Sequence, residues 1–510
     1  MTTRSETDAL SRLPQHVVDV AVVGAGVTGL TTALLLARRG LDVCVVSDDA
    51  ALSDDAAHSD DVAPGGRPDA PAAISRLQGS RLARVRGRTT ASTTRAFAES
   101  QDAAVRWLED FVPSRDVPHR RRPAITYAIG ERALAELDAE ERLGRLLGRP
   151  VEETTDVGLP FQPRRALRLP DQLHVDPGDL LAALRRAARD AGVTLVAPVR
   201  VRGARASNPV VVDTDAGDLR ADRLILATGT PILNRGLYFA KLAPRRTLFL
   251  SSRVADSELP EATAWGIDAP VQQLGAGLGG SDGLLVTAGG EHGVGRSASE
   301  RHAMDALVAG TRRWWPGAEI EREWSAQGYE APHLVPFVGW LPRSRGRIFL
   351  AAGLGGAGLT GGSLTGGVAA ALTLEADLLG PSTDWQKTLH RRLTLPPAVA
   401  AGIGENAAAA TWYARGWWRA LTRELPVAPA EGVGEVGHVG LIPVGVSTVG
   451  GATRSVCAVC PHLGAVVSWN DLEHTWDCPA HGSRFAPDGR RLEGPSVRDL
   501  APAPRARARR

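Results

Sequence analysis

Four residues near the C-terminal end have the types and spacing of a metal centre. Cys460 and His462 form one pair, and Cys478 and His481 form a second pair that begins after fifteen intervening residues. Glycine follows closely behind each pair, as a tight loop requires. Two Cys and His pairs on two loops suit a [2Fe–2S] cluster in which imidazoles replace two of the thiolates on one iron. The spacing therefore predicts such a cluster with these four ligands.

A structural zinc site is the alternative, with Cys457, Cys460, Cys478 and His481 as ligands. A Cys-x-x-Cys pair suits tetrahedral zinc. The zinc interpretation leaves His462 and the His-Gly-Ser turn at 481–483 without a role. We therefore favour the iron–sulfur cluster.

A second motif lies near the N-terminus, where a glycine turn joins an apolar segment, 19–23, to an apolar helical segment, 30–39. In this turn Gly24 permits a tight bend, Gly26 lets a pyrophosphate approach the backbone, and Gly29 lets the helix pack closely on the strand. The helix N-terminus would face the phosphates. With a second strand at 42–46, the pattern predicts the opening β-α-β unit of a dinucleotide-binding fold.

The acid that should hold the ribose hydroxyls is displaced, because Ser47 stands at the expected position and Asp48 follows it. Asp49 comes next, and we expect either aspartate to serve after a small shift in register, with Asp48 as the first choice. The glycine motif alone does not separate NAD from FAD. Two later features favour FAD: Thr228 and Gly229 after a strand at 223–227, and a glycine-rich turn at 353–362, with cofactor contacts expected from Gly353, Gly355 and Gly358.

Together these motifs resemble the D-amino-acid-oxidase-like FAD-dependent oxidoreductases, and among them the subgroup with a C-terminal Rieske domain. The stretches 234–242, 324–327 and 336–339 extend the resemblance over nearly the whole chain. The resemblance implies FAD and a [2Fe–2S] cluster as cofactors. It also implies that Cys460 and Cys478 hold the buried iron. His462 and His481 would hold the outer iron, at an exposed tip where electrons enter or leave.

The chain departs from this family at several positions. Ala465 and Ala480 stand where some members carry a bracing disulfide, and Phe485 stands where high-potential members carry tyrosine. Fewer hydrogen-bond donors near the sulfurs predict a potential in the lower part of the Rieske range. An acidic stretch, 48–73, replaces a loop that is rich in Gly and Thr in the family. His333 stands where relatives more often carry aspartate, and it is a weak catalytic candidate beside the alternative of a structural histidine.

Length and charge limit the remaining possibilities. A chain of 510 residues should hold at least two compact units. Its 59 basic and 57 acidic residues give no electrostatic reason to expect a nucleic-acid partner. No apolar run reaches the roughly 18 residues of a membrane span. The first residues lack the pattern of a signal peptide, so we expect a cytoplasmic protein.

The predicted fold class is an α/β FAD-binding domain, Rossmann-like and with an added antiparallel sheet, followed by a small all-β Rieske domain. We expect the oxidoreductase domain at 1–380 with a flexible insertion at 48–73, and a helical linker at 381–423. The Rieske domain should span 424–503, and a disordered tail 504–510. Helices are predicted at 91–111, 179–191 and 364–379 from apolar periodicity.

Joining a flavin to a Rieske cluster predicts a two-electron acceptor that releases electrons singly. The family resemblance implies oxidation of a small amine or amino acid at the C–H bond beside nitrogen, by a dehydrogenase more than by an oxidase. A redox partner protein would meet the Rieske tip. The alternative is an electron-transfer protein without substrate oxidation of its own. A Rieske oxygenase is excluded, because its second iron needs two histidines and a carboxylate, and no His-x4-His pair occurs.

Overall fold

A mainly parallel sheet forms the centre of the N-terminal part in the computed structural model, which describes residues 12–48, 72–149, 151–269, 271–278, 283–356, 361–425 and 427–504. Apolar runs such as β1 (Val18–Val23) are buried on both faces, as is typical of parallel strands. The strand order is β16 (Phe337–Trp340), β17 (Ile348–Ala352), β10 (Gly217–Gly229), β1, β2 (Val43–Val46) and β7 (Thr194–Val196).

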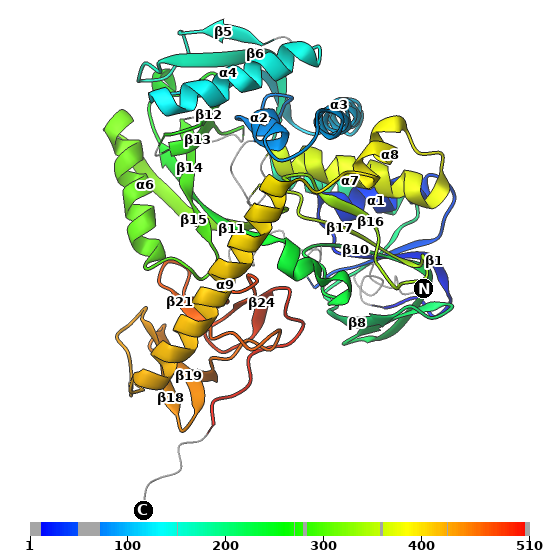
Figure 1. The fold of residues 1–510 in the computed structure, drawn as a ribbon, viewed down its shortest axis with the longest axis vertical. Helices are drawn as coiled ribbons and strands as arrows, with labels where there is room; N and C mark the ends of the chain where they lie inside the picture. The colour runs from blue at the N-terminus through cyan, green and yellow to red at the C-terminus, as the bar shows by residue number, and fades with distance from the viewer. Residues whose placement is uncertain are drawn as a thin grey trace, which may run out of the picture.

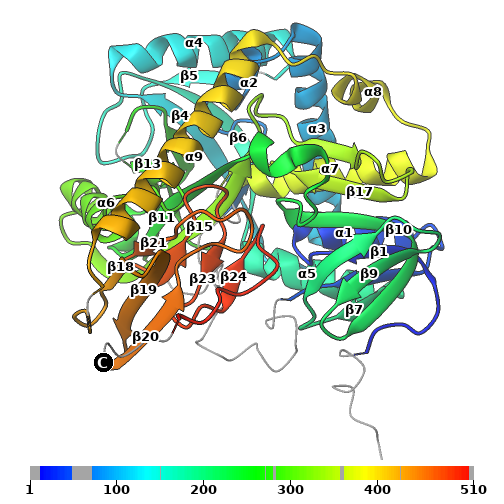
Figure 2. The ribbon, with the colours of Figure 1, turned by 60° about the horizontal axis from the view of Figure 1, so that its bottom comes forward.

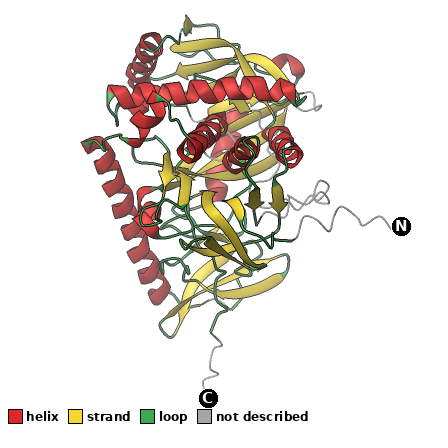
Figure 3. Ribbon diagram, turned by 90° about the vertical axis from the view of Figure 1, so that its right-hand side faces the viewer, coloured by secondary structure: helices red, strands yellow, loops and turns green. Residues whose placement is uncertain are grey.

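Helices cover one face of this sheet, and a strand hairpin extends it (Figure 3). Helix α1 (Val27–Ala37) is apolar all round and almost wholly buried, because it packs between α5 (Pro177–Asp190) and α7 (Gly361–Leu379). Helix α3 (Ala91–Ser114) packs on α7. Strands β8 (Val201–Arg205) and β9 (Val210–Thr214) join the sheet through β10. The three predicted helices are thus present, with ends shifted by up to three residues.

A second sheet lies beside the first and is almost entirely antiparallel. Its order is β15 (Glu319–Glu330), β11 (Ala243–Arg253), β14 (Leu284–Gly293), β13 (Val271–Ala276), β12 (Thr263–Gly266), β4 (His119–Ala128), β6 (Arg165–Val175) and β3 (Ala72–Ile74), and β5 (Glu152–Thr154) pairs with β6. Only β12 and β4 run parallel among these described pairings. Around it lie α2 (Arg81–Arg86), α4 (Glu131–Leu146) and α6 (Glu300–Trp314) (Figure 1). The expected added antiparallel sheet is confirmed.

The C-terminal part is built of short strands in two small sheets. One holds β18 (Gly434–Val439), β19 (Ile442–Val449) and β20 (Ala452–Cys457), and the other holds β21 (Ser468–Asn470), β22 (Thr475–Asp477), β23 (Arg484–Phe485) and β24 (Arg491–Glu493). All their pairings are antiparallel. This confirms the expected all-β character.

Two helices connect the parts, α8 (Asp384–His390) and the long α9 (Pro396–Thr422). Figure 2 shows α9 running across the molecule toward the C-terminal strands. Trp417 donates its indole N–H to the carbonyl of Gly464 at 3.0 Å, whereas Trp418 is 73% exposed. The linker thus packs against the C-terminal part through one face.

The C-terminal part is also fixed to the antiparallel sheet by buried polar contacts. Asp471 accepts hydrogen bonds from the backbone N–H groups of Glu300 and Arg301, at 2.8 and 3.0 Å, and so caps the first turn of α6. Glu473 forms an ion pair with Arg246 of β11, whose side chain is only 1% exposed. These contacts hold the C-terminal domain in one position on β11, β15 and α6.

Some sequence-based expectations fall where the structure does not describe the chain. Gly358 and nearly all of the segment 48–73 lie outside the described residues, as does the tail beyond residue 504. No described helix has both the length and the apolar character that a membrane span requires. The expected cytoplasmic location stays a prediction.

Candidate functional site

The four predicted cluster ligands lie on two loops with matching backbone geometry. In the first loop the N–H of Cys460 donates to Ala465, and the N–H of Gly464 donates back to Cys460. In the second loop the N–H of Cys478 donates to the residue five positions on, and the N–H of Gly482 donates back to Cys478. Both glycines have φ near +80°, a conformation that favours glycine. The two loops are therefore equivalent supports for one Cys and one His each.

The structure brings the two pairs together. The rings of His462 and His481 lie 5.1 Å apart between centroids, and the thiols of Cys460 and Cys478 are within hydrogen-bonding reach of each other. No three His, Cys, Asp or Glu side chains among the described residues surround one point in the way that a mononuclear metal site requires. A binuclear cluster needs only two protein ligands at each iron. The two cysteines lie together and the two histidines lie together, so each couple can serve one iron.

Donors and protonation at this site suit a cluster. The Sγ of Cys478 accepts hydrogen bonds from Cys460 and from the backbone of Ala480 and His481, and these lower its pKa although burial opposes them. The hydrogen bond to Cys478 and burial raise the pKa of Cys460, and the Ser483 hydroxyl partly offsets this. Backbone and hydroxyl donors around both sulfurs are what a thiolate-ligated cluster needs.

The two histidines are held in the form that binds metal. Burial lowers the pKa of both His462 and His481 to about 4, so both imidazoles are neutral at physiological pH. The Nδ1 of His481 is buried and has no hydrogen-bond partner among the described residues. An unsatisfied buried nitrogen beside a second imidazole and two cysteines fits an iron ligand.

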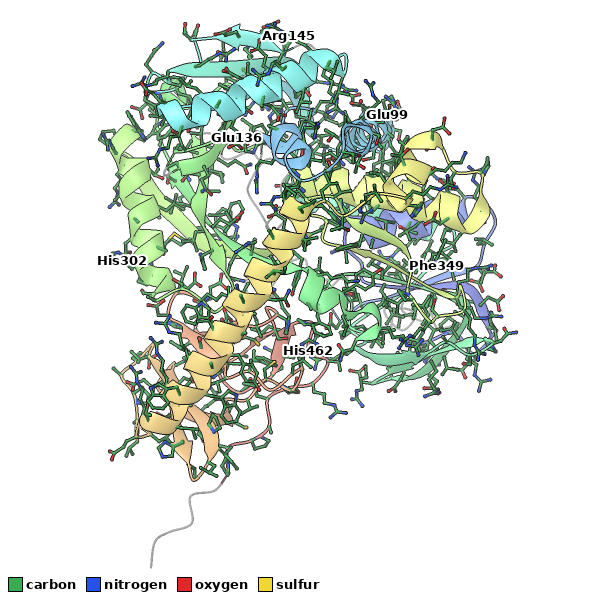
Figure 4. All side chains as sticks on the ribbon, in the orientation of Figure 1. Glu99, Glu136, Arg145, His302, Phe349 and His462 are labelled. Atoms are coloured by element: carbon green, nitrogen blue, oxygen red, sulfur yellow. The ribbon has the colours of Figure 1, made fainter. Side chains whose placement is uncertain are left out.

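The histidine tip is not exposed as expected, because the N-terminal part covers it. Phe239 places its ring 5.0 Å from His462 and 4.9 Å from His481, edge on to both. The Nε2 of His462 lies 3.0 Å from Oδ1 of Asn234. Both histidines are half-buried, and Figure 4 shows His462 on the side of the C-terminal domain that faces the rest of the chain. Within the first loop, Pro461 and Leu463 remain exposed.

A cavity of about 380 Å³ lies at the carboxyl ends of β1, β2 and β10, where dinucleotides bind in such sheets. Predicted cofactor residues that line it are Gly24, Asp48, Thr228, Gly229 and Gly355. Gly353 lies next to this wall, with φ +69° and its N–H donating to Gly229. The structure thus brings most of the predicted cofactor residues to one cavity.

The other two motif glycines differ in what the structure requires, since Gly29 tolerates no side chain and Gly26 borders open space. A Cβ at Gly29 would lie 1.9 Å from the carbonyl oxygen of Gly24, so helix α1 could not approach the turn with any larger residue. A Cβ at Gly26 would meet nothing within 4 Å, so the space before the helix is open. No side chain in the described part of the chain caps the first turn of α1. Its N–H groups are therefore available to an anion, which fits the pyrophosphate of FAD.

A second cavity of about 410 Å³ lies between the antiparallel sheet and α2, α3 and α7, and it shares Leu354, Gly355 and Gly356 with the first. Arg81 and Arg84 lie in its wall with Glu291, and Arg81 pairs with Glu330 at 3.3 Å. Burial raises the pKa of Glu291. The two cavities meet at the glycine-rich turn from which cofactor contacts were expected. Charged groups line the second cavity, which we call the inner cavity.

Gln327 and Tyr329 lie between the first cavity and the cluster. Both line the cavity, and Gln327 donates to the carbonyl oxygen of Gly482 at 2.8 Å, directly after His481. The hydroxyl of Tyr329 donates to Gly494 at 3.0 Å, and its backbone carbonyl accepts from Gly355 at 3.0 Å. The Oε1 of Gln327 has no partner among the described residues, so it can accept a hydrogen bond from a cofactor. Sequence reasoning assigned neither residue a role: Gln327 ends the stretch 324–327 that resembles the family, but nothing in the spacing marks it or Tyr329 as a cofactor contact.

His333 does not line either cavity. It is 4% exposed; its Nδ1 lies 3.3 Å from the N–H of Val335 and its Nε2 lies 3.2 Å from Nε of Arg392. Burial, with Arg392 beside it, lowers the pKa of His333 to about 3. Its surroundings are those of a satisfied structural histidine.

Comparison with known proteins assigns both parts of the chain. A family model described as FAD dependent oxidoreductase matches residues 19–372, and one described as Rieske [2Fe-2S] domain matches residues 428–504. The chain is 25% identical over 489 residues to the putative Rieske 2Fe-2S iron-sulfur protein YhfW of Bacillus subtilis (strain 168), covering 94% of this chain and 92% of that protein. A cytochrome b6-f complex iron-sulfur subunit of Synechococcus sp. is 51% identical over 49 residues, which are 10% of this chain and 28% of that subunit.

Solved structures share the fold of the N-terminal part. Glycine oxidase from Geobacillus kaustophilus superposes with a TM-score of 0.58 at 20% identity, covering 72% of this chain and 96% of the oxidase. L-proline dehydrogenase from P. horikoshii superposes with a TM-score of 0.56 at 14% identity, covering 74% of this chain and 98% of the dehydrogenase. The L-amino acid deaminase of Proteus myxofaciens superposes with a TM-score of 0.56 at 14% identity, covering 74% of this chain and 93% of the deaminase.

Proposed function

Because this chain belongs to the FAD-dependent oxidoreductase family and carries a Rieske [2Fe–2S] domain, we propose that it oxidises an amine or amino acid and passes the electrons to the cluster. When bound, FAD takes two electrons from the C–H bond beside nitrogen, and the cluster carries one electron at a time. The oxidised product would be an imine, which water hydrolyses.

One observation carries the proposal: the same short stretch of β15 serves both cofactor sites. Gln327 and Tyr329 form part of the wall of the FAD cavity and donate hydrogen bonds to Gly482 and Gly494 of the Rieske domain. The two sites are therefore separated by side chains of a single strand. This shared strand supports the proposal that electrons pass from the flavin site to the cluster within one chain.

The inner cavity supports a zwitterionic substrate. Arg81 and Arg84 offer positive charge for a carboxylate, and Glu291 and Glu136 offer negative charge for an ammonium group (Glu136 is labelled in Figure 4). An uncompensated charge is costly in such a site, so paired charges of both signs favour an amino acid over a neutral amine. The neighbouring folds include a glycine oxidase and an L-proline dehydrogenase, which agrees with this class.

We further propose dehydrogenase rather than oxidase chemistry, with electrons leaving to a redox partner at Pro461 and Leu463. These residues are the exposed part of the first cluster loop, next to the covered His462. The division into an oxidoreductase domain at 1–380, a linker at 381–423 and a Rieske domain at 424–503 is proposed with it. The matched ranges 19–372 and 428–504, with α8 and α9 between them, support these limits.

The test is anaerobic reduction of the purified protein by a panel of amino acids and small amines. We expect at least one substrate to bleach the flavin absorption and then reduce the cluster, seen in the visible spectrum and by electron paramagnetic resonance. A His481→Ala variant is the matched control, in which the flavin should still bleach without a cluster signal. Reduction of the cluster by an external reductase, without turnover of any amine in a broad panel, would favour the electron-transfer alternative.

A further inference from the structure

The FAD cavity has a wall that belongs to the Rieske domain. Four residues of this wall follow one another at the end of that domain, in and just after β24: Arg491, Leu492, Glu493 and Gly494. On the opposite side stand the strand end and turn of the dinucleotide motif, including Val23 and Gly24. Part of the wall of the cofactor cavity is therefore present only when the Rieske domain is docked.

Arg491 is the residue of this wall that has a hydrogen-bond donor without a partner among the described residues. Its side chain is 9% exposed, and its guanidinium pairs with Asp48, the acid expected to hold the ribose of the cofactor. Its Nε is buried and has no hydrogen-bond partner among the described residues. The other charges nearby are already paired, since Glu493 lies 3.2 Å from Arg484 and Asp499 lies 2.9 Å from Arg200. Arg491 thus keeps a free donor beside the adenosine end of the site.

The backbone of Arg491 is positioned by the N-terminal part. Its N–H donates to Oδ1 of Asp499 at 2.8 Å, and the same oxygen accepts from Arg200 at 2.9 Å. Arg200 also donates to the carbonyl oxygen of Arg491 at 3.5 Å, and it lies 3.9 Å from Asp48. The guanidinium is therefore held at the cavity by contacts that cross between the two domains.

We propose that Arg491 is an FAD-binding residue supplied by the Rieske domain, and that it holds the adenosine diphosphate half of the cofactor together with Asp48. A buried guanidinium presents several N–H donors in a fixed plane, which suits phosphate and ribose oxygens. Because Arg491 reaches the cavity only from a docked Rieske domain, FAD affinity and docking are thermodynamically coupled, and each strengthens the other. This inference rests on the proposed FAD-dependent function. It adds that the FAD site depends on the domain that holds the iron–sulfur cluster.

The test compares full-length R491Q and R491M with wild-type protein and with R490Q, a matched control. Arg490 is the neighbouring residue, is exposed, and has no side-chain hydrogen bond among the described residues. FAD affinity is measured by ultrafiltration and fluorescence of the released flavin, on samples of equal cluster content. Loss of a charge-assisted contact predicts at least about tenfold weaker FAD binding in R491Q and R491M, and no change in R490Q.

A second readout follows the Rieske domain itself. Adding FAD should raise the temperature at which the visible circular dichroism of the cluster is lost in wild type and R490Q, and should raise it less in the Arg491 variants. FAD affinities equal to wild type in whichever Arg491 variant keeps its cluster would overturn this inference and leave the proposed function intact. Failure of the wild-type protein to bind FAD would instead overturn both this inference and the proposed function.

Discussion

Glu473 is the residue whose substitution should most directly loosen the Rieske domain from the N-terminal part. Its carboxylate forms ion pairs with Arg246 of β11 and with Arg484 of β23, and it accepts a hydrogen bond from the N–H of Ser325 at 3.0 Å. The side chains of the two arginines are 1% and 0% exposed. A Glu473→Gln substitution keeps the size of the side chain but leaves a neutral amide between two buried guanidinium groups.

The magnitude follows from the electrostatics of the site. Burial raises the pKa of Glu473, but Arg246, Arg484 and the Ser325 hydroxyl outweigh it, and the pKa falls from 4.5 to about 2. Since one pKa unit corresponds to about 1.4 kcal/mol, the folded protein favours the carboxylate by about 3 kcal/mol. Breaking a buried ion pair by removing one partner costs about 3 to 5 kcal/mol in other proteins. We therefore expect E473Q to lower the unfolding free energy by about 3 kcal/mol at pH 7.

The pH dependence has a definite sign. The pKa of Glu473 is lower in the folded than in the unfolded protein, so its contribution is complete above pH 4.5 and is lost as the pH falls toward 2. The difference between wild type and E473Q should accordingly shrink as the pH is lowered through this range.

Urea unfolding followed by the visible circular dichroism of the cluster measures the difference, with E435Q as control. Glu435 lies on β18 of the same domain, is exposed, and makes no ion pair among the described residues, so we expect a change within about 0.5 kcal/mol. An E473Q protein as stable as E435Q at pH 7, or a difference that does not shrink at low pH, would refute the reasoning.

The other predictions concern the cofactors and the weak catalytic candidate. Cys457→Ala should keep the Rieske absorption and the bound iron and sulfide, and His481→Ala should lose them. Zinc in place of iron, with loss of the metal in both variants, would support the alternative zinc site. In samples matched for bound FAD, Gln327→Ala should slow cluster reduction by up to about tenfold in stopped-flow experiments, since one hydrogen bond is worth about 1 kcal/mol, and it should slow flavin reduction less. A cluster reduction rate equal to that of wild type would contradict the proposed route. His333→Asn should keep kcat/KM and lower stability by about 1 to 3 kcal/mol; a loss of about a hundredfold or more in kcat/KM would instead make it catalytic.

The cluster loops were predictable from the sequence because their chemistry is local. Cys and His at short spacing, followed by Gly464 and Gly482, describe a loop that bends back on its own cysteine, and no distant residue is needed to form it. The glycine motif was predictable for the same reason. Element ends were less certain: α5 begins at Pro177 after an Asp176 cap, a local signal, while apolar periodicity alone placed the start at 179.

Contacts between the domains were not predictable, because they join residues far apart in the chain. Phe239 lies in the stretch 234–242 that resembles the family, but nothing in that stretch shows that its ring touches both histidine rings. Arg491 is one of many arginines in the sequence until the fold sets it against Asp48. The expectation of an exposed tip failed on this point, since the position of one domain on another depends on two whole surfaces.

The docked position also constrains how electrons can leave the protein. Release of the Rieske domain would break the ion pair between Glu473 and Arg246 and remove the cap that Asp471 provides to α6, whereas the pair between Glu473 and Arg484 stays within the domain. Each buried charge left without its partner costs several kcal/mol, so an excursion of the whole domain would be rare. If electrons reach the cluster as proposed, they must therefore leave from the docked state. Because Phe239 and Asn234 lie against the half-buried histidines, the exit path that we propose runs through the exposed loop at Pro461 and Leu463.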